Sequence, residues 1–197
     1  QESVKATITK EGIVGSRMSP CKRGSEKALE KGRWCNHKSA LAVLRDLGAE
    51  RFYAYTKITT VRNPFDRCVS AFHWTNKALL NLTESFDQVR SAFQGYMQTS
   101  LLKADVPTVF VEGKFIIDRA IRFEHLADDL EAVAKELDLP MADHKVPHTK
   151  STAETRKDYP VEDYYDQTTI DLVRERFSWV FERFAYPDHP RFVKECI

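Results

Sequence analysis

Two side chains suited to anion binding, the Arg62 guanidinium and the Ser70 hydroxyl, stand eight positions apart in the chain. A guanidinium presents a fork of N–H donors that matches a phosphate group, and a hydroxyl adds one more donor. If both lie beside the first turn of a helix, the unpaired backbone N–H groups of that turn would complete an anion site. The pair therefore predicts a site for a phosphate group.

The residues around this pair predict a strand that ends in a turn and is followed by a helix. Residues 52–61 are rich in β-branched and aromatic residues, which favour a strand. Pro64 cannot continue a strand but suits the start of a helix. Asn63 can cap that helix, and Asp66 favours its positive first turn. The alternative is an ordinary capped strand–turn–helix without a ligand.

The whole run from Thr60 to Phe72 resembles the 3′-phosphate-binding segment of sulfotransferases that use 3′-phosphoadenosine 5′-phosphosulfate (PAPS). The likeness is to the Golgi carbohydrate sulfotransferases and their short bacterial and algal relatives. Their pattern reads Val-Arg-(Asn/Asp)-Pro-aromatic-(Asp/Glu)-Arg-x-(Val/Ile)-Ser-(Ala/Gly)-aromatic, and every position is matched here. The resemblance implies that Arg62 and Ser70 hold the 3′-phosphate of PAPS, and that Arg67 is structural.

The resemblance extends over roughly residues 36–187. Residues 115–126 resemble the later strand of the family, which ends in Arg-Phe-Glu-x-Leu, and an aromatic-rich helix closes the match near 184. It implies one α/β domain over 1–197, with a parallel sheet flanked by helices as in P-loop NTPases. Strands are expected at 52–61, 108–111 and 115–123, and helices near 37–47, 65–80, 85–99, 125–137 and 164–184.

Composition agrees with one globular domain. The 197 residues are 42% hydrophobic and 30% charged. The sequence contains no run of 18 apolar residues, so it predicts no membrane-spanning helix. The net charge of +1 hides an asymmetry, because residues 1–62 hold 13 Lys and Arg against 6 Asp and Glu. This basic third suits an anionic nucleotide or an acidic sugar polymer, and the alternative is a solvated basic face. No nucleic-acid partner is expected.

The four cysteines show no metal-binding spacing, and no metal is predicted. Cys68 is expected to be a small buried residue, while a bridge between Cys21 and Cys35 depends on the compartment. Residues 81–83 form a glycosylation sequon, which often occurs by chance. The sequence leaves both the Golgi lumen and the cytoplasm open as the compartment of the protein.

Transfer of a sulfuryl group needs a base for the acceptor hydroxyl, and His37 is the candidate. It precedes a Ser-Ala helix, as the family's histidine does, and an imidazole titrates near neutrality; a helix cap or surface histidine is the alternative. His73 is a weaker rival for which packing is favoured. Glu124 is expected to be structural, paired with Arg122 or Arg119, and ranks third as a base because some related enzymes use a carboxylate.

A polar, basic loop late in the chain contains Lys150, Ser151, Arg156 and Lys157. Related enzymes close over the nucleotide with such a loop, so the resemblance implies that Lys150 and Ser151 bind the cofactor. A solvated loop is the alternative.

The 5′-phosphosulfate loop of the family has no clear copy here. Residues 20–25 are a weak candidate, and we favour the interpretation that the first strand and loop are missing from this chain, with residues 2–8 forming the helix that follows the loop. The leading hypothesis is transfer of a sulfuryl group from PAPS to a carbohydrate hydroxyl, which releases adenosine 3′,5′-bisphosphate (PAP). The alternatives are an inactive module that binds PAP or another phosphorylated ligand and, ranked last, a P-loop kinase.

Overall fold

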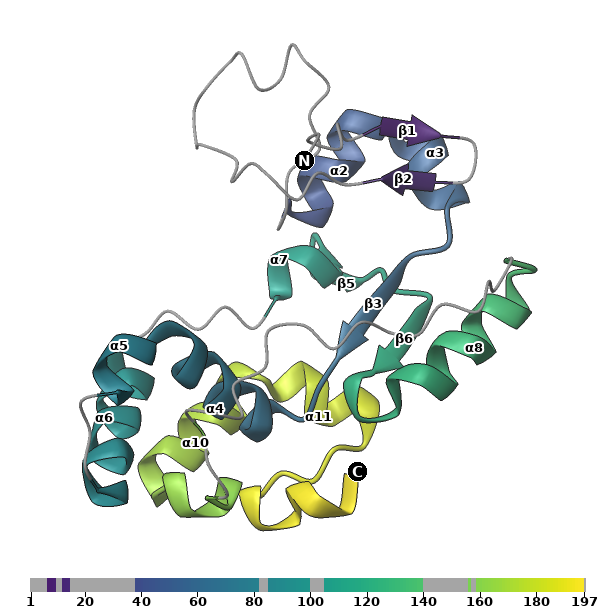
Figure 1. The fold of residues 1–197 in the computed structure, drawn as a ribbon. Coiled ribbons are helices and arrows are strands. Elements are labelled where there is room, and N and C mark those ends of the chain that lie inside the picture. The colour runs from purple at the N-terminus through teal and green to yellow at the C-terminus, as the bar shows by residue number, and fades with distance from the viewer. Residues whose placement is uncertain are drawn as a thin grey trace. The chain divides into compact units, whose positions relative to one another are not determined.

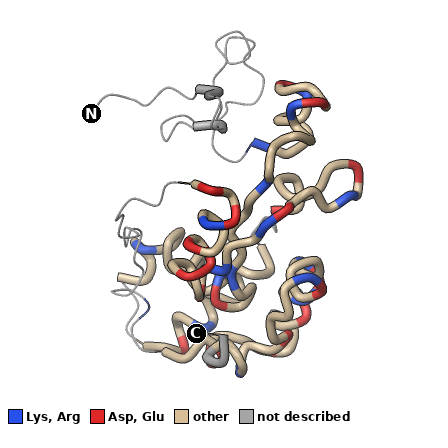
Figure 2. The backbone as a smooth tube through the Cα atoms, turned by 90° about the vertical axis from the view of Figure 1, so that its right-hand side faces the viewer, with Lys and Arg blue, Asp and Glu red and all other residues tan. Residues whose placement is uncertain are grey.

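The computed structural model describes residues 38–81, 85–99, 105–139, 156 and 159–193, and the backbone alone of 7–9, 12–14 and 194–196. The chain divides into two compact units. Unit 1 comprises residues 1–59 and 105–119, and unit 2 comprises residues 60–104 and 120–197. Figure 2 shows acidic and basic residues interspersed along the described chain.

Unit 1 combines two antiparallel strand pairs with short helices. Strands β1 (Thr7–Thr9) and β2 (Gly12–Val14) pair with each other, as do β4 (Phe110–Val111) and β5 (Lys114–Phe115). The helices are α2 (Ala40–Leu47), α3 (Ala49–Ala54) and α7 (Val106–Val109). Ser39 caps α2, since its hydroxyl accepts a hydrogen bond from Ala42 N at 3.2 Å.

The strand predicted at 52–61 is wrong in its first half. Residues 49–54 form α3, and β3 (Ile58–Val61) begins only at Ile58. Gly48 ends α2 with a φ of 78°, a conformation that suits glycine, and the chain then starts a second short helix. Phe52 is buried in a cluster with Ala40 and Val111. Burial of this aromatic ring on a helix outweighs the strand preference of its residue type.

Three other predicted boundaries also change. Thr7 and Ile8 lie in β1 rather than in a helix, as their β-branched side chains favour. Residues 106–109 form α7, so only residues 110–111 of the strand predicted at 108–111 are extended. The strand predicted at 115–123 is divided, because Phe115 pairs with Phe110 in a hairpin and β6 (Arg119–Arg122) begins four residues later.

Strands β3 and β6 pair in a two-stranded sheet, and their arrows run in the same direction in Figure 1. The division between the units falls within both strands, so that Val61 and Ile121, both buried, belong to unit 2. A mixed helix and strand structure with a small parallel sheet confirms the α/β class.

Helices make up most of unit 2. Its α-helices are α4 (Pro64–Thr75), α5 (Lys77–Leu80), α6 (Phe86–Thr99), α8 (Leu126–Glu136), α10 (Gln167–Arg176) and α11 (Ser178–Phe184). The 3-10 helices are η1 (Phe123–His125), η2 (Val161–Tyr164) and η3 (Pro190–Cys196). The helices predicted at 85–99 and 125–137 are confirmed. Those predicted at 65–80 and 164–184 are each interrupted, at Asn76 and Phe177 respectively.

Helix α4 lies in the core of unit 2. Its residues Phe65, Cys68, Val69 and Phe72 recur at helical spacing and are at most 1% exposed. Phe72 makes an edge-to-face contact with the buried Phe93 of α6, with ring centroids 5.5 Å apart. This packing fixes the helix that carries Ser70.

Candidate functional site

The turn between β3 and α4 is built around Asn63, which is fully buried. Its side-chain oxygen accepts hydrogen bonds from Phe65 N at 3.0 Å and Asp66 N at 3.4 Å, and its carbonyl accepts from Arg67 N at 2.9 Å. The predicted cap is confirmed. These bonds use the N–H groups of the first turn that were expected to bind an anion, so the donors at this site are mainly side chains.

The two predicted anion-binding side chains converge. Arg62 Nη1 donates to Ser70 Oγ at 3.3 Å, across the turn that joins β3 to α4. Arg62 Nε also donates to Asp66 Oδ2 at 2.6 Å, and Nη2 forms an ion pair with the same oxygen. The guanidinium stacks over the Phe123 ring, 4.3 Å from its centroid. The geometry permits joint anion binding by Arg62 and Ser70, and that role stays a prediction.

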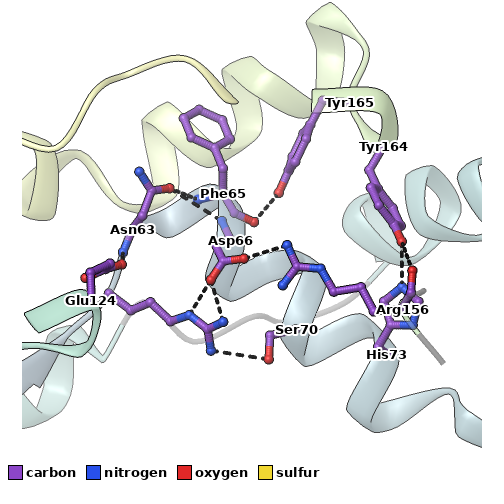
Figure 3. A network of polar contacts seen from close by, with 10 residues as sticks. Asn63, Phe65, Asp66, Ser70, His73, Glu124, Arg156, Tyr164 and Tyr165 are labelled. Atoms are coloured by element: carbon purple, nitrogen blue, oxygen red, sulfur yellow. Dashed lines mark hydrogen bonds and ion pairs between the residues drawn. The ribbon is translucent and has the colours of Figure 1, made fainter. Parts of the chain in front are cut away.

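A second arginine reaches the same carboxylate. Arg156 Nη2 lies 2.7 Å from Asp66 Oδ1, so Asp66 bridges two guanidiniums (Figure 3). The three side chains are 22%, 16% and 22% exposed for Arg62, Asp66 and Arg156. The sequence places Arg156 in a basic loop, but it gives no signal that links this residue to a carboxylate ninety positions earlier.

This network borders a pocket of about 470 Å³ in unit 2. Its charged lining residues are Arg62, Asp66, Glu124, Arg156, Glu162 and Arg191, and its other lining residues are Phe123, Tyr159, Pro160, Val161, Pro190 and Val193. The pocket therefore joins guanidinium donors to aromatic and proline surfaces, a combination that suits a ligand with an anionic group and a ring.

Glu124 has a structural role, as predicted, but with other partners. Its carboxylate accepts from Asn63 N at 2.7 Å and from Tyr186 Oη at 2.6 Å. The expected partner Arg122 instead makes a bidentate pair with Asp129, at 2.7 and 2.8 Å. Hydrogen bonds from Arg122 lower the pKa of Asp129 to about 2. Glu124 thus ties η1 to the turn at the start of α4.

His73 is a packed core residue and not an accessible base. It is fully buried, its Nε2 lies 2.9 Å from Tyr164 Oη, and that hydroxyl donates in turn to the Arg156 carbonyl at 3.5 Å (Figure 3). Burial, with a smaller contribution from the Arg156 charge, lowers the pKa of His73 to about 4. The packing interpretation of His73 is confirmed.

Two further residues of α4 are also structural. Cys68 is buried, as predicted, and burial raises the pKa of its thiol to about 12. The Arg67 guanidinium lies over the Phe177 ring, 5.3 Å from its centroid. Both side chains hold α4 in place.

Several candidates lie outside the described residues. They are His37, Lys150, Ser151, the cysteines Cys21 and Cys35, and the loop candidate at 20–25. Their roles stay predictions. Within the described ranges, no His, Cys, Asp and Glu side chains cluster as metal ligands would. None of the described helices has the length and apolar character needed to cross a membrane.

Residues 20–102 match the model of the sulfotransferase family. The matched stretch contains Arg62, Ser70 and all of α4, and it supplies Arg62 and Asp66 to the lining of the pocket. It supports assignment to the sulfotransferase family, which agrees with the sulfotransferase resemblance seen in the sequence. No curated protein and no solved structure gave a significant match to the chain.

Proposed function

We propose that this chain transfers a sulfuryl group from PAPS to a hydroxyl of a carbohydrate acceptor and releases PAP. The observation that carries the proposal is the 3.3 Å contact between Arg62 Nη1 and Ser70 Oγ. Both residues of this contact lie within the family match, and Arg62 also lines the pocket. A guanidinium and a hydroxyl directed to one point can bind two oxygens of a single phosphate group.

The 3′-phosphate is the part of the donor that we assign to Arg62 and Ser70. This phosphate takes no part in the bond that breaks, so its binding energy serves to position the nucleotide for reaction. The buried face of α4 keeps Ser70 in register, and the Asp66 carboxylate restricts the rotation of the Arg62 side chain. The nucleotide is therefore bound to a rigid element.

In the transfer step, the acceptor oxygen forms a bond to sulfur while the bond from sulfur to the 5′-phosphate oxygen breaks. The electron pair of the broken bond remains on PAP, and a base removes the acceptor proton. We assign that base to His37, and we assign further nucleotide contacts to Lys150 and Ser151. An imidazole is suited to the step because it exchanges protons near neutral pH.

The basic N-terminal third supports an anionic carbohydrate as the acceptor. Residues 1–62 have a formal charge of +7, whereas the other 135 residues have −6. Such an excess attracts a polyanion at low ionic strength and loses its effect as salt screens it. Transfer to an acidic polysaccharide should therefore weaken with salt more steeply than transfer to a neutral one.

Calorimetric titration with PAP tests the phosphate assignment. Arg62→Ala should weaken PAP binding by about tenfold or more, because loss of a charged hydrogen bond costs about 1.5–3 kcal/mol. Ser70→Ala should also weaken binding, by a smaller factor. Arg45→Ala and Ser178→Ala, which change exposed residues of the same types, are the matched controls. Unchanged affinity in both site variants would contradict the assignment.

Transfer of labelled sulfate across a panel of sugars tests the chemistry. His37→Ala should lower turnover far more than it lowers nucleotide affinity, and near-normal turnover would exclude His37 as the base. If the unmodified protein binds PAP but transfers no sulfate to any acceptor, the chain is a nucleotide-binding module instead.

A further inference from the structure

We infer that Glu124 and Tyr186 are positioning residues for the proposed phosphate site, and that they act through Arg62. Neither side chain is assigned a contact with the nucleotide. The inference rests on the proposed function, because it concerns how the guanidinium assigned to the 3′-phosphate is kept in place. It connects η1 and the segment after α11 to the turn between β3 and α4.

The Glu124 carboxylate links two segments that are distant in the sequence. Its Oε1 accepts a hydrogen bond from Asn63 N at 2.7 Å (Figure 3). Its Oε2 accepts from Tyr186 Oη at 2.6 Å. Because each oxygen has a different donor, a rotation of the carboxylate would weaken both bonds. Tyr186 therefore favours the orientation in which Glu124 meets Asn63.

The bond to Asn63 N acts on the peptide group that follows Arg62. The N–H of Asn63 and the carbonyl carbon of Arg62 belong to one planar unit, so this bond fixes the orientation of the Arg62 backbone at the end of β3. That orientation determines where the Arg62 side chain starts. Asn63 is fully buried, so water cannot replace Glu124 as the acceptor without entering the core.

The same short helix also supports the other end of Arg62. The ring of Phe123 in η1 lies against the guanidinium, with its centroid 4.3 Å from Cζ. The ring covers a face of the planar group, whereas the N–H donors are directed along its edges. With the backbone and the guanidinium both held, Arg62 Nη1 lies 3.3 Å from Ser70 Oγ.

Tyr186 follows an unusual turn of the backbone. Ala185 ends α11 with a φ of 51° and a ψ of 27°, which is the left-handed conformation. This conformation is unfavourable for alanine, so contacts of the neighbouring residues must outweigh its cost. Tyr186 is only 8% exposed, and the bond from its hydroxyl to Glu124 is one such contact.

The charge of Glu124 distinguishes a positioning role from a purely electrostatic one. Glu124 lines the same pocket as Arg62. A carboxylate that acted through its charge alone would repel an anionic nucleotide, and its removal would strengthen the binding of PAP. Removal of a positioning residue would weaken the binding of PAP. The two roles therefore predict changes of opposite sign.

The test compares PAP with adenosine 5′-phosphate, which lacks the 3′-phosphate. Calorimetry gives the ratio of the two dissociation constants, and a general loss of structure would weaken the binding of both nucleotides alike. Glu124→Ala should reduce the preference for PAP by about threefold or more, the lower range of coupling between residues in contact. Glu124→Gln should keep most of the preference, because its amide oxygen can still accept from Asn63 N. An increased preference in Glu124→Ala would refute the inference.

Tyr186→Phe tests the same hydrogen bonds through the loss of one oxygen atom, and it decides the matter if Glu124→Ala does not fold. It should reduce the preference for PAP by about twofold or more. The matched controls are Tyr96→Phe, which removes a hydroxyl from α6, and Glu131→Ala, which removes an exposed carboxylate from α8. Both should leave the preference unchanged, and thermal melting confirms that each variant is folded. Equal reductions in the controls and the site variants would show that the effect is not specific, and the inference would be wrong.

A double-mutant cycle shows whether Glu124 acts through Arg62. In the Arg62→Ala background, Glu124→Ala should cause no further loss of the preference, because the guanidinium that it positions is absent. An equal loss in both backgrounds would refute the inference.

Two outcomes separate the inference from the proposed function. If Arg62→Ala reduces the preference and neither Glu124→Ala nor Tyr186→Phe does, the phosphate site stands and the inference alone fails. If Arg62→Ala leaves the preference unchanged, or the wild-type protein binds neither nucleotide, the phosphate assignment itself fails and the inference fails with it.

Discussion

Lowering the pH should destabilise the fold through His73. This histidine is fully buried, and its Nδ1 has no hydrogen-bond partner among the described residues. Burial lowers its pKa from 6.5 to about 4. The unfolded chain takes up a proton on His73 more readily than the folded one. The contribution of the neutral His73 to the stability of the fold is therefore fully present above pH 6.5. It is lost progressively as the pH falls from 6.5 to about 4.

The size of the effect follows from the two pKa values. One pKa unit corresponds to about 1.4 kcal/mol. The full difference in the His73 pKa between the folded and unfolded states therefore corresponds to about 3 kcal/mol of folding stability. Between pH 7.5 and pH 5 the unfolded histidine becomes almost fully protonated while the folded one stays neutral. The free energy of unfolding should therefore fall by about 2 kcal/mol over this interval through His73 alone.

Urea unfolding at pH 7.5 and pH 5 measures the effect. Carboxylates also titrate in this interval, so the informative quantity is the difference between wild type and His73→Gln, a variant that cannot take up the proton. On acidification, the free energy of unfolding of the variant should fall by about 2 kcal/mol less than that of the wild type. Tyr164→Phe, which keeps His73 buried but removes its hydrogen-bond partner, should retain most of the wild-type loss. Equal losses in wild type and His73→Gln would refute the argument.

Three other predictions concern α4 and its packing. Asn63→Ala removes the oxygen that accepts from Phe65 N and Asp66 N, and it should reduce the free energy of unfolding by about 1–2 kcal/mol in urea titrations; an unchanged midpoint would exclude the cap as a stabilising element. Cys68 should react with iodoacetamide only after denaturation, because its thiol is buried and its pKa is raised to about 12; rapid modification of this residue in the native protein, located by peptide mass spectrometry, would contradict its burial. Phe93→Ala should reduce the free energy of unfolding by about 3–5 kcal/mol, because the ring is fully buried against Phe72 and Tyr164. A reduction below about 1 kcal/mol would show that neighbouring side chains fill the space left by the ring.

Local contacts of the site could be predicted from the sequence. Asn63, Pro64 and Asp66 act over a single turn, and the relevant rules for helix starts depend only on adjacent residues. Arg62 and Ser70 converge for the same reason, since a tight turn into a helix brings the end of a strand beside the second helical turn. A short motif is therefore enough to place them.

Contacts between distant segments could not be predicted. The pairing of Arg156 with Asp66 depends on how the chain returns to α4 after ninety residues, and neither residue type nor spacing encodes that path. The change from strand to helix at Phe52 has a related cause. The strand preference of an aromatic residue is weak, and burial against Ala40 and Val111, one of them nearly sixty positions away, decides the local conformation.

The cap formed by Asn63 has a consequence for how binding could change during evolution. Phosphate sites made of backbone amides are largely insensitive to substitution, because every residue but proline supplies the same amide. Here the cap already uses those amides, and under the proposed function the side chains of Arg62 and Ser70 supply the donors instead. Each donor can therefore be gained or lost by a single codon change, which allows the anion preference of the pocket to be altered without disturbing the helix beneath it.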